Sequence, residues 1–189
     1  MKKNTLRKRL LGRRNKIKRK TVASNSREIL RNLFGIKEFL SAKKVMFYSA
    51  FGGEVETAGM IEKSLRLRKR VFVPKVVGNS IKGIEIKNLE NMVLGKYGIL
   101  EPKTKRAGRR VSGLIDVLVV PGVVFDVNCN RIGFGRGYFD RFLKKQKGFK
   151  IGLAHDFQMV KKIPVSGSDV PMDFVITEKH IFKRGHRNG

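Results

Sequence analysis

Short apolar runs alternate with amphipathic stretches along most of this chain. Residues 117–120 form a continuous run of Val and Leu that ends at Pro121 and Gly122. This pattern is typical of a strand buried on both faces, because Pro cannot donate to a sheet ladder. Comparable runs predict further strands at residues 44–49, 70–77, 150–154 and 174–177. Residues 79–86 and 92–94 predict either a hairpin or two edge strands.

Apolar residues at helical spacing predict the helices. Residues 1–20 are expected to form a basic amphipathic helix, with Leu6, Leu10 and Ile17 roughly on one face. Residues 24–40 predict a second helix, capped by Ser24 and interrupted near Gly35, and residues 57–67 a third. A short helix is expected over residues 138–143. Helices that alternate with single strands favour an α/β domain with a largely parallel sheet.

The remaining segments predict irregular structure. Residues 97–102 read as a turn, residues 103–113 as a surface loop, and residues 123–137 as a loop leading into a glycine-rich turn. The basic tail from residue 179 is expected to be frayed. At 189 residues the chain is large enough for a proper core, so we expect one domain over residues 1–189.

The charge of the chain is extreme. It carries 43 Lys and Arg against 15 Asp and Glu, a formal net charge of +28. Such a charge attracts polyanions, so nucleic-acid binding is an alternative function. However, the basic residues are spread along the chain and no recognisable nucleic-acid module appears. A polyanionic substrate or a generally basic proteome would explain the charge equally well.

The N-terminal segment concentrates this charge. Residues 1–20 contain eleven Lys or Arg and no acidic residue. This segment could be a solvated helix face, or an arm that binds nucleic acid loosely. A mitochondrial transit peptide fits the composition, but the rest of the chain is equally basic. Lys3 and Arg7 are four residues apart, so both could reach one anionic ligand, although spacing alone does not establish this.

The number of cysteines and the hydropathy of the chain indicate where in the cell the protein is expected. Cys129 is the one cysteine, which excludes an internal disulfide and fits a reducing, cytoplasmic location. No apolar run reaches membrane-spanning length, and the N-terminus lacks the apolar core of a secretory signal. The three His have no metal-ligand spacing, so no structural metal is expected.

A glycine-rich turn carries the first candidate chemistry. Gly133, Gly135 and Gly137 fall at alternate positions, with Arg131 and Arg136 beside them. Glycine lets main-chain N–H groups approach a ligand closely, and guanidinium groups bind phosphate with charge-assisted hydrogen bonds. The pattern therefore describes a phosphate cradle, although a tight turn before a helix explains it too. Its spacing is neither the dinucleotide fingerprint nor the P-loop.

A pair of acidic residues carries the second. Glu54 and Glu56 follow a predicted strand and precede a predicted helix in a chain where acids are scarce. Loops after the strands of α/β folds are where sites are built. The alternative is that Glu56 or Thr57 only caps the helix that follows.

Six blocks of this chain resemble the 5-formyltetrahydrofolate cyclo-ligase family, also called 5,10-methenyltetrahydrofolate synthetases. The blocks, in order, are KxxLR from Lys3, GEVET from Gly53, GILEP from Gly98, VVPGVVFD from Val119 after Asp116, NRIGFGRGYFDR from Asn130, and the late set Gln158, Ile163-Pro164, Asp169, Asp173 and Ile176-Thr177-Glu178. The resemblance covers nearly the whole chain. It implies a three-layer α/β/α fold with a largely parallel sheet, related to the sugar-isomerase and CoA-transferase folds.

The resemblance also implies an enzyme, an ATP-dependent ligase that closes a ring. It would convert 5-formyltetrahydrofolate to 5,10-methenyltetrahydrofolate with ATP and Mg²⁺, release ADP and phosphate, and pass through a phosphorylated formyl intermediate. The substrate would be a reduced formylfolate, with or without the acidic polyglutamate tail of cellular folates. A monomer or homodimer that binds no membrane is expected.

Roles are carried over by motif position. The expected catalytic residues are Lys3, Arg136 and Tyr138. The expected ATP-binding residues are Lys3, Arg7, Arg131, Gly133, Phe134, Gly135, Arg136, Gly137, Tyr138 and Asp140. The expected folate-binding residues are Phe51, Glu54, Glu56, Met60 and Tyr97, and the expected metal ligands are Asp140 and Asp173. Phe139 stands where the family commonly has Tyr, which could weaken one polar contact by roughly 1 kcal/mol.

Overall fold

A seven-stranded sheet forms the centre of the computed structural model, which describes residues 2–78, 80–95, 100–103 and 114–185. Its strands follow the order β12 (Ile181–Lys183), β11 (Phe174–Ile176), β9 (Phe149–Leu153), β6 (Val117–Val120), β1 (Lys44–Met46), β2 (Arg70–Val77) and β3 (Ser80–Ile86). The five strands from β11 to β2 are parallel, and the strands at both edges are antiparallel. The predicted, largely parallel sheet is thus confirmed.

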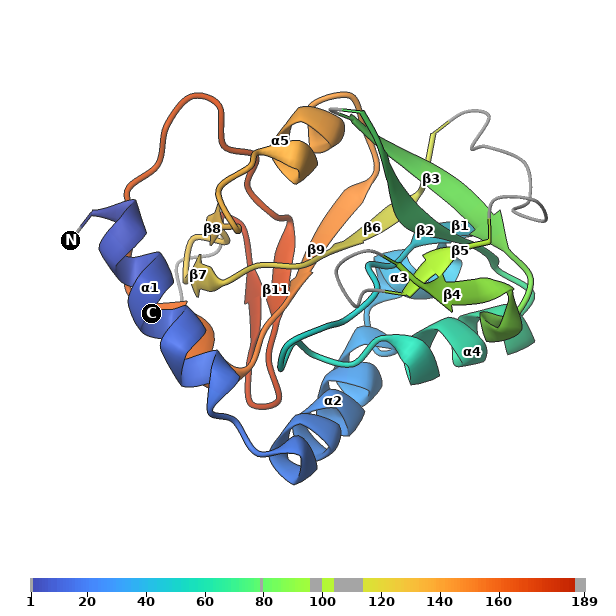
Figure 1. Ribbon diagram of the computed structural model, residues 1–189, viewed down its shortest axis with the longest axis horizontal. Helices are drawn as coiled ribbons and strands as arrows, with labels where there is room; N and C mark the ends of the chain where they lie inside the picture. The colour runs from blue at the N-terminus through green and yellow to red at the C-terminus, as the bar shows by residue number, and fades with distance from the viewer. Residues whose placement is uncertain (1, 79, 96–99, 104–113, 186–189) are drawn as a thin grey trace.

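Helices cover both faces of this sheet (Figure 1). On one face lie α2 (Arg19–Leu33), α3 (Lys37–Ser41) and α4 (Ala58–Arg66), whose apolar residues share a core with alternate residues of the strands. On the other face lies α5 (Tyr138–Leu143), which packs on a second core. Burial on both sides explains the continuous apolar run of β6, all four residues of which are buried. The structure therefore has the three-layer arrangement expected.

A small second sheet places the N-terminal helix. Its strands are β10 (Met159–Val160), β7 (Val124–Asp126) and β8 (Arg131–Ile132), and helix α1 (Lys3–Asn15) packs Leu6 and Leu10 against it. The buried Asp126 carboxylate accepts hydrogen bonds from the backbone N–H groups of Asn128, Asn130 and Ile163, at 2.9–3.0 Å. This network fixes the segment that leads from β6 to α5. Helix α1 consequently runs beside that segment (Figure 1).

The remaining elements are short. Strands β4 (Met92–Leu94) and β5 (Leu100–Pro102) form a two-stranded sheet, and 3-10 turns η1 (Leu89–Asn91) and η2 (Asp156–Gln158) precede β4 and β10. Within the described part of the chain, no helix combines the length and the apolar character needed to cross a bilayer.

The helix boundaries differ from the predictions at one place. The first helix ends at Asn15 rather than at residue 20, and α2 begins at Arg19, so Ser24 lies inside α2 and does not cap it. The cause is Lys18, whose extended backbone (φ −69°, ψ 138°) separates the two helices. The predicted interruption near Gly35 is confirmed, since α2 ends at Leu33 and α3 begins at Lys37.

Several short strands were missed. The segment predicted as a loop contains β7 and β8, the predicted turn contains β5, and the predicted frayed tail contains β12. These strands have two or three residues, too few to show an alternating pattern, and β12 exists because it pairs with β11. Residues 79–86 and 92–94 do not form a hairpin with each other: β3 pairs with β2 at the edge of the main sheet, and β4 pairs with β5. Most of the predicted surface loop at residues 103–113 lies outside the described residues.

Candidate functional site

The glycine turn, residues 133–137, connects β8 to α5. Gly135 has φ 105° and Gly137 has φ 65°, and Gly137 is the N-cap residue of α5. Residues with a side chain rarely adopt such positive φ values, so glycine is required at these two positions. Between them, Arg136 is exposed, and its carbonyl accepts a hydrogen bond from Arg141 Nη1 at 3.1 Å.

Helix α1 carries two predicted phosphate contacts, one of which meets this turn. Arg7 Nε donates to the carbonyl of Gly133 at 2.8 Å, and a Cβ added at Gly135 would lie 3.4 Å from Arg7 Cζ. One turn earlier, Lys3 Nζ forms an ion pair with Asp169 and donates to Ser166 Oγ at 3.3 Å. Arg7 thus contacts the glycine turn, and Lys3 contacts the segment that contains Ser166 and Asp169.

Asp169, to which the sequence analysis gave no role, is the partner of Lys3. Its carboxylate accepts from Lys3, from the backbone N–H of Ser166 at 2.7 Å and from Ser166 Oγ at 3.1 Å. Partial burial alone would raise the pKa of Asp169, but these hydrogen bonds hold it below its usual range. The available signal was its place in the late motif block of a chain with few acids.

Arg131 and Asp140 form a largely buried ion pair that links the two ends of the glycine turn. Arg131 is only 6% exposed, and its Nη2 donates to Asp140 Oδ1 at 2.7 Å while Nη1 donates to the carbonyl of Pro121 at 3.3 Å. Burial lowers the pKa of the Arg131 guanidinium, and the Asp140 carboxylate opposes that shift. Arg131 therefore ties β8 to both α5 and the end of β6.

The loop after β1, residues 51–54, meets the glycine turn through stacked aromatic rings. Phe51 and Phe134 stack with ring centroids 5.3 Å apart and planes 26° apart, and Phe134 is 44% exposed. The predicted ATP-side residue Phe134 and the predicted folate-side residue Phe51 are therefore neighbours. Tyr138, at the start of α5, is half-buried beside the guanidinium of Arg141.

Glu54 is a buried member of the 51–54 loop. Its Oε1 lies 3.3 Å from Arg14 Nη1 of α1, and its Oε2 accepts from the backbone N–H of Phe51 at 3.2 Å. Burial raises the pKa of Glu54 to about 7, although both of these partners favour the ionised form. Glu54 is therefore positioned by α1 rather than presented to solvent.

His155 and Arg14 support this loop, and neither was predicted. His155 is fully buried; its Nε2–H donates to the carbonyl of Gly53 at 3.2 Å, while its Nδ1 accepts from the Asn25 side chain at 3.2 Å. A carbonyl only accepts, so these partners fix the tautomer. Burial lowers the pKa of His155, which keeps the ring neutral in this role. Lone basic residues in a basic sequence gave no signal that would separate them from surface charges.

The other predicted folate-side residues have different surroundings. Glu56 is exposed, and its side chain has no partner within the described residues, whereas its backbone N–H donates to Ser26 Oγ at 2.9 Å. Met60 is 0% exposed and belongs to the main core, where it has no surface to offer a ligand. Tyr97 lies outside the described residues.

The two predicted metal ligands are not brought together. Asp173 lies at the start of β11 and its carboxylate accepts from the backbone N–H of Lys150 at 2.8 Å, at the N-terminal end of the parallel strands. Asp140 Oδ1 instead accepts from the backbone N–H of Val170, the residue after Asp169, at 3.4 Å. The negative charges of Asp140 and Asp169 both oppose the lowering of the Arg131 pKa that burial causes. Among the described residues, no group of three or more candidate ligands forms a metal cluster.

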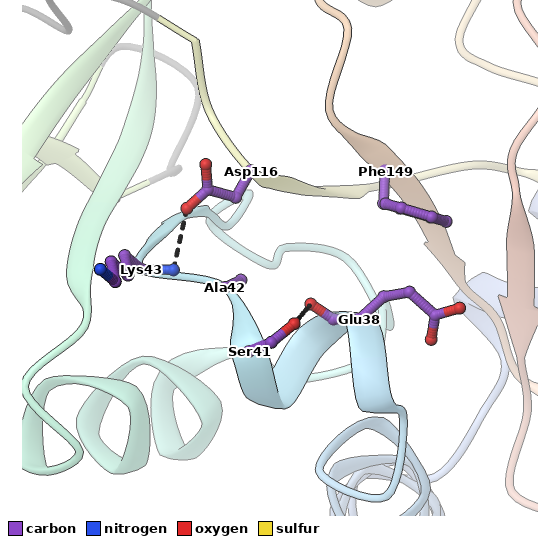
Figure 2. A pocket seen from close by; sticks show the side chains of 6 residues that line it. All are labelled: Glu38, Ser41, Ala42, Lys43, Asp116 and Phe149. Carbon is purple, nitrogen blue, oxygen red and sulfur yellow. Dashed lines mark hydrogen bonds between the residues drawn. The ribbon is translucent and has the colours of Figure 1, made fainter.

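A hollow elsewhere on the surface lies at the opposite ends of the strands. Figure 2 shows its lining, which comprises Glu38, Ser41, Ala42, Lys43, Asp116 and Phe149. Asp116 there accepts from the backbone N–H groups of Lys43 and Lys44 at 2.8 Å. Ligands of parallel α/β sheets bind outside the carboxyl ends of the strands. The carboxyl ends carry the 51–54 loop and His155, so the hollow is not the candidate site.

We predict that Glu54 makes the stability of the protein depend on pH. Its pKa of about 7 lies above its ordinary value of 4.5, so the folded state favours the protonated form. The contribution to stability is full below pH 4.5 and is lost as pH rises through 7, by up to about 3 kcal/mol. Urea unfolding of the wild type and of Glu54→Gln should show this difference in slope between pH 5 and 8. Parallel pH profiles for the two proteins would contradict it.

Comparisons with known proteins agree with the motifs. The model of the 5-formyltetrahydrofolate cyclo-ligase family matches residues 1–178. A probable 5-formyltetrahydrofolate cyclo-ligase of Caenorhabditis elegans is 31% identical over 177 residues, covering 86% of each chain. The 5-formyltetrahydrofolate cyclo-ligase of Escherichia coli K12 is 32% identical over 148 residues, covering 75% of this chain and 81% of that protein.

Two solved structures have the same fold. The NMR structure of Aquifex aeolicus 5,10-methenyltetrahydrofolate synthetase is 35% identical, with a TM-score of 0.88 over 100% of this chain and 96% of that one. The 5,10-methenyltetrahydrofolate synthetase of Mycoplasma pneumoniae is 26% identical, with a TM-score of 0.73 over 94% of this chain and 99% of that one.

Proposed function

The chain belongs to the 5-formyltetrahydrofolate cyclo-ligase family, and on this premise we propose that it closes 5-formyltetrahydrofolate to 5,10-methenyltetrahydrofolate at the expense of ATP. One observation of the fold carries the proposal. Helix α1 contacts the glycine turn through Arg7 and the 51–54 loop through Arg14. A nucleotide at the first and a folate at the second would therefore lie side by side.

The chemistry requires activation of the formyl group. A formamide oxygen is a poor leaving group, so the γ-phosphoryl group of ATP is first transferred to it, which breaks the bond to ADP. The second folate nitrogen then attacks the formyl carbon, a proton leaves, and the C–O bond breaks to release phosphate. No covalent bond to the protein is needed, so catalysis rests on positioning and on neutralising phosphate charge.

The basic residues of α1 suit the phosphate role. Arg7 is held against the turn by Gly133, and Lys3 is held by Asp169, so both cations are preorganised before a nucleotide arrives. Lys3 would contact the transferred phosphate, and Arg136 and Tyr138 would contact the nucleotide from the glycine turn and the start of α5. Phosphate favours such charge-assisted contacts.

Glu56 and Phe51 are the folate-side residues that the geometry favours. Glu56 offers an exposed carboxylate to the polar edge of a pteridine, and Phe51 offers a ring face at the junction with the glycine turn. Glu54 acts through Phe51 and Arg14 rather than by direct contact, because it is buried between them. The buried Met60 supports the core behind the loop.

A magnesium ion bound with ATP would be held by Asp140 and Asp169. Carboxylate oxygens are the ligands that Mg²⁺ prefers, and Asp140 and the residue after Asp169 are in contact. The ion would supply charge neutralisation on the phosphates. Asp173, the other expected metal ligand, is not assigned to the ion in this proposal, because its carboxylate already accepts from the backbone N–H of Lys150 in β9.

We predict that Asp169→Asn and Asp173→Asn separate these assignments. Asp169→Asn should weaken Mg·ATP binding at least about tenfold, and it should weaken metal-free ATP binding much less, only through the loss of its contact with Lys3. Asp173→Asn should leave both affinities unchanged and cost about 1 kcal/mol of stability. Calorimetric titration with and without Mg²⁺ measures the first pair of values, and thermal unfolding measures the last. A loss of Mg²⁺ dependence in Asp173→Asn alone would reverse the assignment.

The reaction itself is tested by a direct assay. Purified protein with 5-formyltetrahydrofolate, ATP and Mg²⁺ should produce the absorbance of methenyltetrahydrofolate. One molecule of ADP should form for each ring that is closed. No product at any protein concentration would overturn the proposal. The relatives and structures named above give the nucleic-acid alternative no support. A cytoplasmic location and a monomer or homodimer remain predictions.

A further inference from the structure

Arg14 is the most deeply buried basic side chain of α1, at 2% exposure. Its Nε donates to the carbonyl of Gly52 at 3.1 Å, and its Nη1 lies 3.3 Å from Glu54 Oε1. Both partners belong to the 51–54 loop. The second half of α1 is thus attached to the loop expected to receive the folate.

The face of the same guanidinium contacts the stacked aromatic rings. Arg14 Cζ lies 5.1 Å from the ring centroid of Phe134 and 5.9 Å from that of Phe51. A guanidinium within about 6 Å of a ring centroid is attracted to the aromatic face. Because Phe134 belongs to the glycine turn, Arg14 touches segments from both halves of the site.

The 51–54 loop packs closely against α1. Gly53 has φ 76°, and a Cβ added there would lie 2.7 Å from the backbone carbonyl oxygen of Arg14. On its other side the carbonyl of Gly53 accepts from His155. A displacement of α1 would therefore be transmitted to the loop by direct contact.

The first half of the same helix contacts the predicted phosphate site through Arg7. Arg7 and Arg14 are seven residues apart, about 10 Å along a helix. A helix of this length moves as one body, so charge neutralisation at Lys3 and Arg7 and the position of Arg14 are mechanically linked.

We propose that Arg14 is a positioning residue that couples nucleotide binding to folate binding. The identity of the two ligands rests on the proposed function. A nucleotide bound at Lys3 and Arg7 adds contacts that strengthen the packing of α1 on the glycine turn. Through Arg14 it also strengthens the packing of Phe51 and Glu54, so the folate then binds a loop that is held more firmly. By linkage, the folate must raise the affinity for the nucleotide by the same factor.

The test compares Arg14→Lys with Arg9→Lys. Lysine keeps the positive charge beside Glu54 but lacks the planar group that reaches Gly52 and Phe134. Arg9 is on the same helix, and its exposed side chain makes no hydrogen bond or ion pair with any residue the structure describes. Calorimetry gives the Kd of 5-formyltetrahydrofolate with and without saturating β,γ-imido-ATP and Mg²⁺, and the reciprocal titration gives the Kd of the ATP analogue.

We expect the ATP analogue to lower the folate Kd at least about fivefold in the wild type and in Arg9→Lys. In Arg14→Lys the factor should fall below about twofold in both titrations, with each ligand still bound alone. A full coupling factor in Arg14→Lys, or none in the wild type, would overturn the proposal. A wild type that binds no folate at all would instead contradict the proposed function.

A second variant covers the case in which Arg14→Lys does not fold. Phe134 is partly exposed, so Phe134→Leu removes one ring from the guanidinium face without opening the core. Its coupling factor should fall between those of the wild type and of Arg14→Lys. An unchanged factor in Phe134→Leu would count against a path through the stacked rings.

Discussion

Replacing Lys3 with alanine is expected to lower kcat/KM for ATP by about 100-fold, because it removes a preorganised cation from the phosphate site. Lys3 is held by Asp169 and Ser166 at the start of α1, four residues before Arg7, which contacts the glycine turn. The affinity for 5-formyltetrahydrofolate measured without nucleotide should change less than twofold. Steady-state kinetics with ATP as the varied substrate, together with a folate titration, measure both quantities.

Lys8→Ala is the matched control for this result. Lys8 is on the same helix, and its exposed side chain makes no hydrogen bond or ion pair within the described part of the chain. It carries the same charge, so it controls for the loss of general electrostatic attraction by a chain of net charge +28. Equal losses in Lys3→Ala and Lys8→Ala would mean that net charge, and not position, is responsible. Unchanged kinetics in Lys3→Ala would make its role structural.

Replacing Gly53 with alanine is expected to destabilise the protein by about 2–5 kcal/mol and to abolish most folate binding. The new Cβ would meet the carbonyl oxygen of Arg14 at 2.7 Å, and the residue would keep φ 76°. A backbone atom cannot move aside cheaply, and a positive φ costs a further 1–2 kcal/mol or so for alanine. The 51–54 loop would therefore separate from α1 and carry Glu54 with it.

Gly12→Ala is the control for Gly53→Ala. Gly12 is inside α1, and a Cβ there meets nothing within 4 Å, so alanine should stabilise the helix by roughly 0.5–1 kcal/mol. Thermal unfolding should show Gly12→Ala to be more stable than the wild type and Gly53→Ala to be less stable. Folate titration should show a loss of affinity only in Gly53→Ala. Wild-type stability and folate affinity in Gly53→Ala would show that the contact between α1 and the loop is dispensable.

The sequence predicted the elements whose signal is local. The apolar run of β6 and the stripe of α4 were predicted because burial on two faces or on one stripe imposes a pattern of several residues. Strands β7, β8 and β12 have two or three residues and owe their existence to partners distant in the chain. No window of sequence that short can distinguish them from loops.

The candidate site divides in the same way. The glycine turn, Lys3 and Arg7 were predicted from motifs, and α1 places Arg7 against the turn and Lys3 against Asp169. Arg14 and His155 were missed, because their importance comes from burial against Gly52 and Gly53. Burial of one arginine among many basic residues leaves no mark in the sequence.

Asp169 and Asp173 illustrate the same limit for the metal site. Both are acidic residues in one motif block, and only the direction of β11 separates them. Asp173 immediately precedes that strand and accepts from Lys150 N–H, whereas Asp169 lies four residues earlier and meets Lys3.

A crystal structure with β,γ-imido-ATP, Mg²⁺ and 5-formyltetrahydrofolate tests most directly whether α1 joins a nucleotide site to a folate site. We predict that the triphosphate contacts Lys3, Arg7 and the glycine turn, and that its γ-phosphate faces the formyl oxygen of a folate lying against Phe51 and Glu56. Phosphates bound away from α1, or a folate remote from the 51–54 loop, would contradict the shared site.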